Sequence, residues 1–313
     1  MEKIPIGLIG TGRIAHDQHI PVILASEEFT LVACTDRSGD VAGIETFYDI
    51  EKMQAVHPEI EAVTITAPTT VHYQAAKLAL EAGKHVLMEK PPCATTAEID
   101  RLVALAHDTG RTLFQTWHQR EAPRVACVRN WLKTRAVTGG RIVWKEDVSL
   151  CHPGQNWVWQ PGGYGVFDPG INAISILTKI LPCPVFVEKA DLSFPADCDC
   201  PVAAEIVFRT DEGARIEASM NFKNDGPPIR DVSIDTEGGS IALVDAATKL
   251  IIDKKIQEMP KSFDDYHAEY TAIYRHFAAL IADGASDADV TPLRLVADVF
   301  LIARRHAVAP INK

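Results

Sequence analysis

Three polar side chains combine a reactive type with a spacing that would hold them in place. Lys90 precedes two prolines, and a residue before proline is restricted to extended geometry, so its amine would be held at a fixed point. Asp168 and Asn172 are four residues apart, so on a helical turn they share one face. A carboxylate, a cation and an amide suit proton removal from a hydroxyl and stabilisation of the resulting charge. The plainer interpretations are a solvated Glu89-Lys90 pair, a helix cap at Asp168 and a surface amide at Asn172.

A glycine-rich turn follows the first apolar run of the chain. Residues 4–9 are apolar and end in Gly10-Thr-Gly12-Arg13-Ile14-Ala15, which fits the pattern G-x-G-x-x-G/A. In that pattern the first glycine makes the strand-to-helix turn, the second lets the backbone approach a pyrophosphate, and the small third residue lets the helix pack closely. The pyrophosphate would lie at the helix N-terminus. The sequence thus predicts a dinucleotide site that includes Gly10, Gly12, Arg13 and Ile14.

The next apolar run, residues 29–34, ends at Thr35-Asp36-Arg37. An acid at this strand end is where the ribose hydroxyls of a dinucleotide are held. Because a carboxylate repels a 2′-phosphate, Asp36 favours NAD over NADP. Arg37 leaves NADP open, since a guanidinium could stack on adenine or bind that phosphate. The alternative is that both are ordinary polar residues at the end of a strand.

The first 120 residues alternate strand-like and helix-like segments. The predicted strands are 4–9, 29–34, 62–67, 85–88 and 112–116, and the predicted helices include 71–82 and 95–110. This alternation predicts a doubly wound parallel sheet, an α/β Rossmann domain. Ligands of such sheets bind beyond the carboxyl ends of the strands, where Asp36, Pro68, Lys90 and His118 fall.

The alternation stops near residue 121. Predicted helices are 124–134, 262–281 and 293–307, and predicted extended segments are 141–150, 202–208, 214–222, 232–235 and 241–244. Strands joined by turns indicate a mostly antiparallel sheet, so the second half is expected to be an open-sheet α+β domain. The last helix could return toward the Rossmann domain.

Length and composition set the broad class. The 313 residues predict two domains, 1–120 and 121–313. The net charge of −11, from 31 Lys plus Arg and 42 Asp plus Glu, disfavours nucleic acid and anionic membranes as partners. We expect no secretory signal and no membrane-spanning helix, because the start of the chain lacks the signal pattern and no 18 apolar residues run together. The seven scattered cysteines predict free thiols in a reducing cytoplasm and no metal site.

A loop rich in aromatic and polar residues precedes Asp168. It contains Glu146, Asp147, His152 and Trp157. Sugars present apolar C–H faces and hydroxyl edges, so indoles beside carboxylates and imidazoles suit them. The sequence therefore predicts that these four residues contribute to a sugar-binding site, with His118, Asp168 and Asn172. The plainer interpretation is that the tryptophans anchor the core or an interface.

Together these motifs make the chain resemble the Gfo/Idh/MocA oxidoreductase family. The matching segments are Gly10-x-Gly12-x-x-Ala15, Ala67-Pro68-Thr69-x-x-His72, Glu81-Ala-Gly-Lys-His-Val86 and Glu89-Lys90-Pro91. The resemblance implies that Lys90 lies beside the nicotinamide and the reacting hydroxyl, and it implies a homodimer formed through one face of the second sheet. The further cofactor-binding residues that it implies are Ala67, Pro68, Thr69, His72 and Glu89.

The chain departs from the family at one catalytic position. Asn172 stands where a histidine usually follows the aspartate of the D-x-x-x-H site. An amide can hold a hydroxyl but cannot act as a base, so proton removal falls to Asp168 or Lys90.

The run from Trp144 to Val148, with His152-Pro-Gly-Gln and Phe167-Asp-Pro-Gly-Ile-Asn, resembles one branch of that family. This branch holds bacterial L-arabinose and D-galactose 1-dehydrogenases. The resemblance implies oxidation of the anomeric carbon of a pyranose to the aldonolactone, with reduction of NAD(P). Three alternatives stay open: a dehydrogenase of another substrate such as a different aldose or an inositol, a cofactor-binding, sugar-responsive regulator without catalysis, and a carboxyl-handling enzyme such as a dihydrodipicolinate-type reductase. The likeness across the second domain disfavours the last of these. The presence of both Lys90 and Asp168 favours the enzyme.

Overall fold

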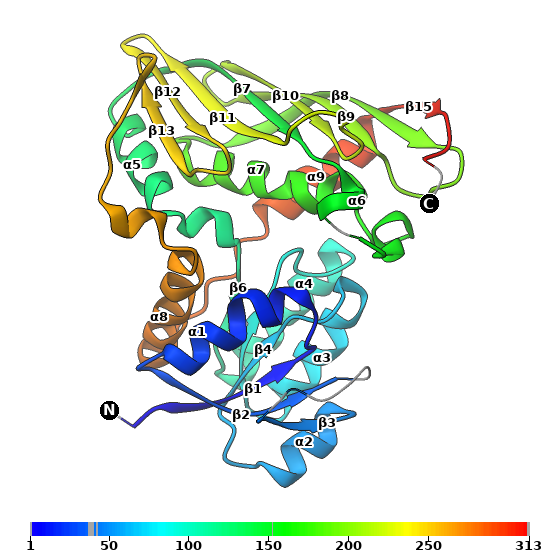
Figure 1. The fold of residues 1–313 in the computed structure, drawn as a ribbon, viewed down its shortest axis with the longest axis vertical. Coiled ribbons are helices and arrows are strands. Elements are labelled where there is room, and N and C mark those ends of the chain that lie inside the picture. The colour runs from blue at the N-terminus through cyan, green and yellow to red at the C-terminus, as the bar shows by residue number, and fades with distance from the viewer. Residues whose placement is uncertain (1, 37–40, 42, 152, 312–313) are drawn as a thin grey trace. The chain divides into compact units, whose positions relative to one another are not determined.

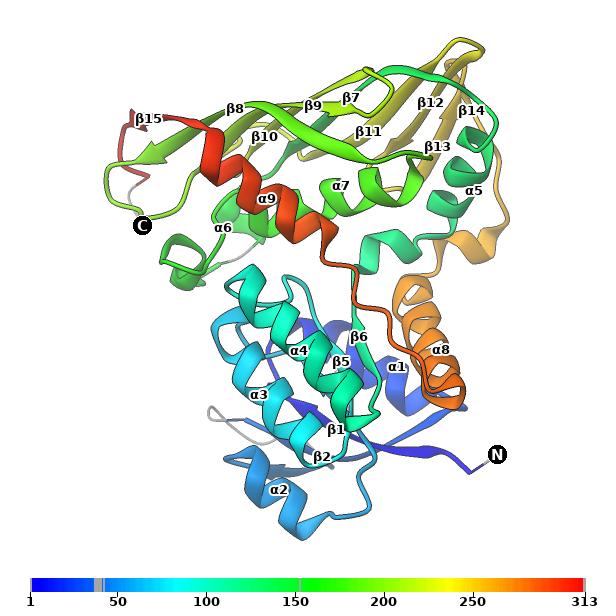
Figure 2. The ribbon, with the colours of Figure 1, turned by 180° about the vertical axis from the view of Figure 1, so that it is seen from behind.

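The computed structural model describes residues 2–36, 41, 43–151 and 153–311, and the chain divides into two compact units (Figures 1 and 2). The first unit holds the residues up to His118 together with Tyr266–Val290, and the second holds Gln119–Asp265 and the chain from Thr291 onward. The sequence predicted a single boundary at residue 120. The structure differs from this at Tyr266–Val290, which belongs to the first unit, whereas the predicted helix 293–307 lies in the second.

The first unit is built on six parallel strands in the order β3-β2-β1-β4-β5-β6. The strands are β1 (Ile4–Ile9), β2 (Phe29–Thr35), β3 (Glu45–Phe47), β4 (Ala62–Ile65), β5 (His85–Met88) and β6 (Leu113–Gln115). The helices are η1 (Ala15–His19), α1 (Ile20–Ala25), α2 (Ile50–Val56), α3 (Thr69–Glu81), α4 (Thr96–Thr109) and α8 (Ala268–Asp283). Helices α1 and α8 cover one face of the sheet, and α3 and α4 the other (Figures 1 and 2).

Local sequence fixes the ends of these helices. At the start of α4, the Thr95 hydroxyl accepts from Glu98 N while the Glu98 carboxylate accepts from Thr95 N, a reciprocal cap that satisfies two helix-end donors. The helix ends at Gly110, whose φ of 63° is left-handed and costs glycine nothing.

Helix α8 comes from the second half of the sequence but completes the core of the first unit. Its residues Tyr270, Ile273, Tyr274 and Phe277 recur at helical spacing and are buried against the sheet. Phe277 stacks on Phe29 of β2, with ring centroids 5.6 Å apart. An apolar stripe of this kind is what holds a surface helix on a sheet.

The second unit contains a nine-stranded sheet in the order β14-β13-β12-β11-β7-β10-β9-β8-β15. Among the described residues, two of its pairings, β10 with β7 and β15 with β8, are parallel, and the others are antiparallel. The strands are β7 (Val137–Lys145), β8 (Val185–Pro195), β9 (Ala203–Thr210), β10 (Arg215–Asn221), β11 (Ile229–Thr236), β12 (Gly239–Val244), β13 (Lys249–Ile252), β14 (Lys255–Ile256) and β15 (Arg304–Val308). The predicted class, a doubly wound parallel sheet followed by a mostly antiparallel open sheet, is confirmed.

Helices of the second unit lie on one face of its sheet (Figures 1 and 2). They are α5 (Pro123–Leu132), α7 (Phe167–Ile180) and α9 (Thr291–Ile302). The shorter helical segments of this unit are α6 (Val148–Cys151), η3 (Asn156–Trp159) and η4 (Lys261–Asp264), and η2 (His118–Glu121) begins at the last residue of the first unit before the chain enters the second. No helix within the described ranges is long and apolar enough to cross a membrane.

The predicted helix 293–307 is wrong over its last residues. Helix α9 ends at Ile302, and Arg304–Val308 form β15, which pairs in parallel with β8. Alanine and arginine favour helix locally, but the free edge of β8 offers backbone hydrogen bonds that decide the conformation of these five residues.

Candidate active site

The glycine turn lies directly after β1 and leads into the continuous helical segment η1–α1. Gly10 has a φ of 92°, and a Cβ built there would lie 2.7 Å from the backbone nitrogen of Ala67. At Gly12 a Cβ would meet no heavy atom of the described residues within 4 Å, its chain neighbours aside. The turn is therefore tightly packed at Gly10 and open at Gly12, as a pyrophosphate cradle requires. Arg13 and Ile14 are exposed at the start of the helical segment.

Asp36 follows β2, and its carboxylate is fixed by the glycine turn. The backbone N–H of Thr11 donates to Asp36 Oδ2 over 2.9 Å, and the Thr11 hydroxyl donates to the same oxygen. The acid therefore lies at the end of β2 beside the fingerprint, where a ribose would be bound. Arg37 lies outside the described residues. Thr11 was not predicted as a site residue, although it stands inside the motif, because its partner is 25 residues away.

The segment after β4 is held by a buried histidine. Pro68 precedes α3 and Thr69 begins it. The His72 side chain is buried, with Nε2 2.7 Å from the carbonyl oxygen of Ala67 and Nδ1 3.1 Å from that of Pro92. Burial lowers the pKa of His72, so the ring is neutral near pH 7. A neutral ring carries one N–H, so His72 donates to one of these two carbonyl oxygens, and its ring lies between the loop after β4 and the loop after β5.

Glu89 and Lys90 follow β5, and the peptide bond after Lys90 is cis. Glu89 is 4% exposed. Its carboxylate accepts from Lys90 N over 2.8 Å and lies 3.0 Å from the Tyr270 hydroxyl and 3.2 Å from His19 Nε2. Burial alone raises this carboxyl's pKa, but the hydrogen bond from His19 and the neighbouring positive charges outweigh burial and hold the pKa at about 2. Glu89 is therefore an anion surrounded by donors, and it anchors the backbone of Lys90.

His118 is the first residue after the loop that follows β6, and α8 holds its ring. His118 Nδ1 lies 2.9 Å from Glu269 Oε2, and the imidazole stacks on Tyr270 with ring centroids 5.7 Å apart. The sequence did not predict either Glu269 or Tyr270 as site residues. Their signal is the aromatic stripe of the helix, which begins at Tyr270.

Asp168 and Asn172 lie one turn apart in α7, as their spacing predicted. They are 2% and 8% exposed. Asn172 Oδ1 has no hydrogen-bond partner among the described residues, and leaving a buried acceptor unpaired costs about 1–3 kcal/mol. A hydroxyl donor from a ligand would offset that cost. The Arg120 guanidinium donates to the carbonyl oxygen of Ser175 over 3.0 Å and so fixes the same helix from outside the pair.

Glu146 is buried at the end of β7 beside a cation. Glu146 Oε1 accepts from Trp144 Nε1 over 2.9 Å and from Arg230 Nε over 2.6 Å. A buried carboxylate needs such partners. Arg230, on β11, was not predicted, and nothing local in the sequence points to it, since the two residues are 84 positions apart.

The other predicted sugar-site residues lie in different local settings. Asp147 Oδ1 accepts from the backbone N–H and hydroxyl of Ser149, so it caps the short helix α6. Trp157 is partly exposed in η3, whereas Trp159 is buried against Phe222 with centroids 5.7 Å apart. His152 lies outside the described residues. Within the part of the chain that the structure describes, no group of three or more His, Cys, Asp or Glu side chains could hold a metal ion.

Comparison with known proteins bears on this arrangement. Residues 4–116 match the model of the Gfo/Idh/MocA oxidoreductase family, NAD-binding Rossmann fold. The chain is 40% identical to a galactose 1-dehydrogenase of Pseudomonas fluorescens over 312 residues, which is 98% of each chain. It is 42% identical to a solved D-galactose-1-dehydrogenase from Rhizobium etli, with a TM-score of 0.94 and coverage of 100% of this chain and 99% of that one.

A more distant structure shares the fold. A 3-ketoreductase from Actinomadura kijaniata, solved with NADP and TDP-benzene, is 20% identical, with a TM-score of 0.84 and coverage of 98% of this chain and all of the other. The chain therefore belongs to the Gfo/Idh/MocA oxidoreductase family. It is an NAD(P)-dependent dehydrogenase, and its glycine turn, open at Gly12 and flanked by Asp36, fits that cofactor.

Proposed function

We propose that the protein is a sugar 1-dehydrogenase that oxidises the anomeric carbon of D-galactose, and of L-arabinose, to the aldonolactone. The observation that carries the proposal is the likeness to a galactose 1-dehydrogenase over 98% of both chains. The buried pair Asp168 and Asn172 supports it. L-arabinose is D-galactose without the exocyclic hydroxymethyl group, so a pocket that binds the shared ring hydroxyls would accept both.

Bound nicotinamide would supply the hydride acceptor. The residues that would hold the dinucleotide are the turn from Gly10 to Ile14, for the pyrophosphate, and Asp36, for the adenosine ribose. The Asp36 carboxylate favours NAD, because it accepts hydrogen bonds from ribose hydroxyls and repels a 2′-phosphate. NADP stays open as a second cofactor.

Oxidation of a hemiacetal carbon also requires that its hydroxyl lose a proton. We assign proton removal to Asp168, a carboxylate that can act as general base. Lys90 would stabilise the developing oxyanion through its positive charge and could relay the proton. Asn172 would accept a hydrogen bond from a sugar hydroxyl through its Oδ1, which has no partner among the described residues. His118, Glu146 and Trp157 are the further residues that we assign to the sugar site. The assignment of Asp147 and His152 to that site stays a prediction from the sequence.

Initial rates of nicotinamide reduction test the proposal directly. They would be measured with D-galactose, L-arabinose and D-glucose, each with NAD and with NADP. We expect high rates with the first two sugars, low rates with glucose and a preference for NAD. Tight binding of NAD with no turnover on any of these sugars would support a sugar-responsive regulator or a dehydrogenase of another polyol.

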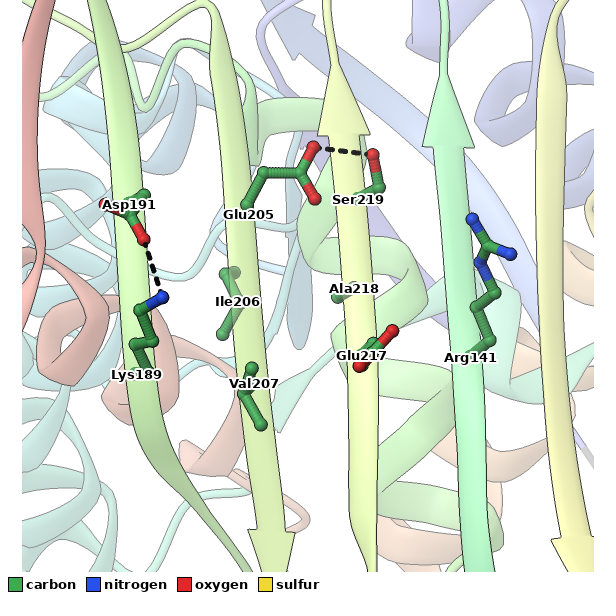
Figure 3. Close-up of a pocket in the computed structure, with 9 residues that line it drawn as sticks. All are labelled: Arg141, Lys189, Asp191, Glu205, Ile206, Val207, Glu217, Ala218 and Ser219. Carbon is green, nitrogen blue, oxygen red and sulfur yellow. Dashed lines mark hydrogen bonds and ion pairs between the residues drawn. The ribbon is translucent and has the colours of Figure 1, made fainter.

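We also propose a cytoplasmic homodimer formed through the open face of the second unit's sheet. Figure 3 shows a pocket on this sheet in which acidic and basic side chains are interspersed. The charged residues that line it are Arg141, Lys189, Asp191, Glu205 and Glu217. A patch that carries both signs can pair with a second copy of itself about a two-fold axis.

Light scattering after gel filtration tests the dimer. We expect twice the chain mass for the wild type and a shift toward the monomer for the double variant Glu205→Arg with Glu217→Arg. A wild-type monomer would contradict the proposal.

A further inference from the structure

Two consecutive residues at the start of α8 each bind a predicted active-site residue of the first unit. Glu269 Oε2 lies 2.9 Å from His118 Nδ1, and the Tyr270 hydroxyl donates to Glu89 Oε1 over 3.0 Å. The Tyr270 side chain is buried, with its ring stacked on that of His118. One helical turn from the far half of the sequence therefore contacts both His118 and the carboxylate that anchors Lys90.

The surroundings of Glu89 are built to hold a charge in one orientation. Burying a carboxylate is costly unless donors surround it, and three donors do so: His19 Nε2, the Tyr270 hydroxyl and Lys90 N. Because an ionised carboxylate only accepts, the proton on this side of His19 is on Nε2. The other ring nitrogen, Nδ1, lies 2.8 Å from the Tyr274 hydroxyl.

The same chain of hydrogen bonds continues into the sheet. The Tyr274 hydroxyl lies 3.1 Å from Thr64 Oγ1 on β4. The Tyr274 and Thr64 hydroxyls can each donate and accept, so the chain of hydrogen bonds runs from Glu89 through His19 and Tyr274 to Thr64. Each member thus has a partner, and a fully satisfied buried network of this kind rigidifies the groups that it contains.

We propose that Tyr270 and Glu269 are positioning residues of the dehydrogenase: Tyr270 fixes Lys90 through Glu89, and Glu269 fixes the imidazole of His118. The proposal rests on the function proposed above for Lys90 and His118. Oxygen Oε1 of Glu89 is bound by Tyr270 and His19, and this orients the carboxylate so that Oε2 receives the N–H of Lys90. Without the Tyr270 hydroxyl, Oε1 is held by His19 alone, so the carboxylate orients the N–H of Lys90 less tightly.

The test separates this role from packing, because Tyr270 also belongs to the core around β1 and β2. Tyr270→Phe keeps the ring and removes only the hydroxyl. We expect kcat on galactose to fall about tenfold to hundredfold, by analogy with the loss when the hydrogen-bond partner of a metal ligand is removed. The dissociation constant for NAD, measured by titration calorimetry, should stay within about twofold of the wild type.

Glu269 offers a conservative rescue. Glu269→Ala removes the acceptor for His118 Nδ1–H, and we expect KM for galactose to rise with kcat less affected. Glu269→Gln keeps an acceptor oxygen and should restore most of the wild-type KM. Tyr266→Phe is the matched control, because Tyr266 is an exposed tyrosine four residues before Tyr270, and its kinetics should equal those of the wild type. Equal KM values for Glu269→Ala, Glu269→Gln and the wild type would overturn the assignment of Glu269.

A double-mutant cycle with Lys90→Ala decides whether Tyr270 acts through Lys90. If it does, Tyr270→Phe should cost less than about twofold in the Lys90→Ala background, since additivity is expected only for independent sites. The same large cost in both backgrounds would assign Tyr270 a structural role and overturn the proposal. Wild-type turnover in Lys90→Ala alone would instead refute the proposed function, whereas a slow Lys90→Ala with a normal Tyr270→Phe would refute only this inference.

Discussion

Gly12→Ala separates cofactor binding from folding, because the structure leaves room for the added methyl group. The position of a Cβ at Gly12 has no heavy atom of the described residues within 4 Å, chain neighbours aside, and the backbone there is not left-handed. An alanine at a compatible glycine position stabilises the fold by about 0.4–1 kcal/mol, because it restricts the unfolded chain. The melting temperature without cofactor should therefore be unchanged or slightly raised.

The same methyl group would occupy the space in which the pyrophosphate approaches the turn. Inserting a methyl group into a close-packed contact costs about 1–3 kcal/mol, which weakens binding about fivefold to 150-fold. Titration calorimetry with NAD measures this loss, and scanning fluorimetry without NAD measures stability. Unchanged NAD affinity would refute the assignment of the turn to the pyrophosphate.

Gly10→Ala provides the contrast. At position 10 the φ of 92° is strained for alanine, which costs about 1–3 kcal/mol. The added Cβ would also lie 2.7 Å from the backbone nitrogen of Ala67, and this overpacking costs a similar amount. We expect a lower melting temperature even without NAD. Equal melting temperatures of the Gly10→Ala and Gly12→Ala variants would contradict the inference that Gly10 is tightly packed.

Three further predictions concern charge and proton transfer. Asp168→Asn should lower kcat by about 10²–10⁴-fold, the usual contribution of a general base, with NAD affinity unchanged by calorimetry; a kcat near the wild type would exclude Asp168 as the base. Asp36→Ala should raise the ratio of kcat/KM with NADP to kcat/KM with NAD by about tenfold or more, because it removes charge-assisted hydrogen bonds to ribose, and an unchanged ratio would remove Asp36 from cofactor choice. Glu89 has a folded pKa of about 2 against 4.5 for the free side chain, so its ionised form stabilises the fold above pH 4.5 and that stability is lost as the pH falls toward 2. Urea midpoints across this range should therefore fall more steeply for the wild type than for Glu89→Gln, and parallel curves would contradict the lowered pKa.

Local sequence signals were enough for the nucleotide half of the site. The glycine fingerprint and the acid at the end of β2 lie within a few residues of the strands that position them, and parallel strands bring their carboxyl ends to one edge. The sequence therefore placed Asp36, Lys90 and His118 at that edge. The four-residue spacing likewise predicts that Asp168 and Asn172 share one helical face, and both lie in α7.

Contacts between distant segments could not be predicted in this way. Periodicity predicts that residues near 270 form a helix, but it does not say which sheet that helix covers, so Glu269 and Tyr270 were missed. The hydrogen bond between Glu146 and Arg230 could not be predicted for the same reason, because no local sequence signal links β7 to β11. Helix propensity wrongly extended the last helix into β15. The strand conformation of these residues depends on pairing with β8, which lies more than 100 residues earlier in the chain.

The asparagine at position 172 limits which side chains can take part in the proposed proton transfer, and it leaves Asp168 and Lys90 as the candidates. With a histidine there, proton removal could be divided between an imidazole and a carboxylate, but an amide neither gains nor loses a proton near pH 7. Asn172 is buried with an unpartnered Oδ1 among the described residues, so we propose that it selects and orients a hydroxyl. In the proposed mechanism the proton then leaves through Asp168 or Lys90. For this reason the anchoring of the Lys90 backbone by Glu89 bears on the proposed proton transfer, because an amide at position 172 cannot take over from a displaced lysine.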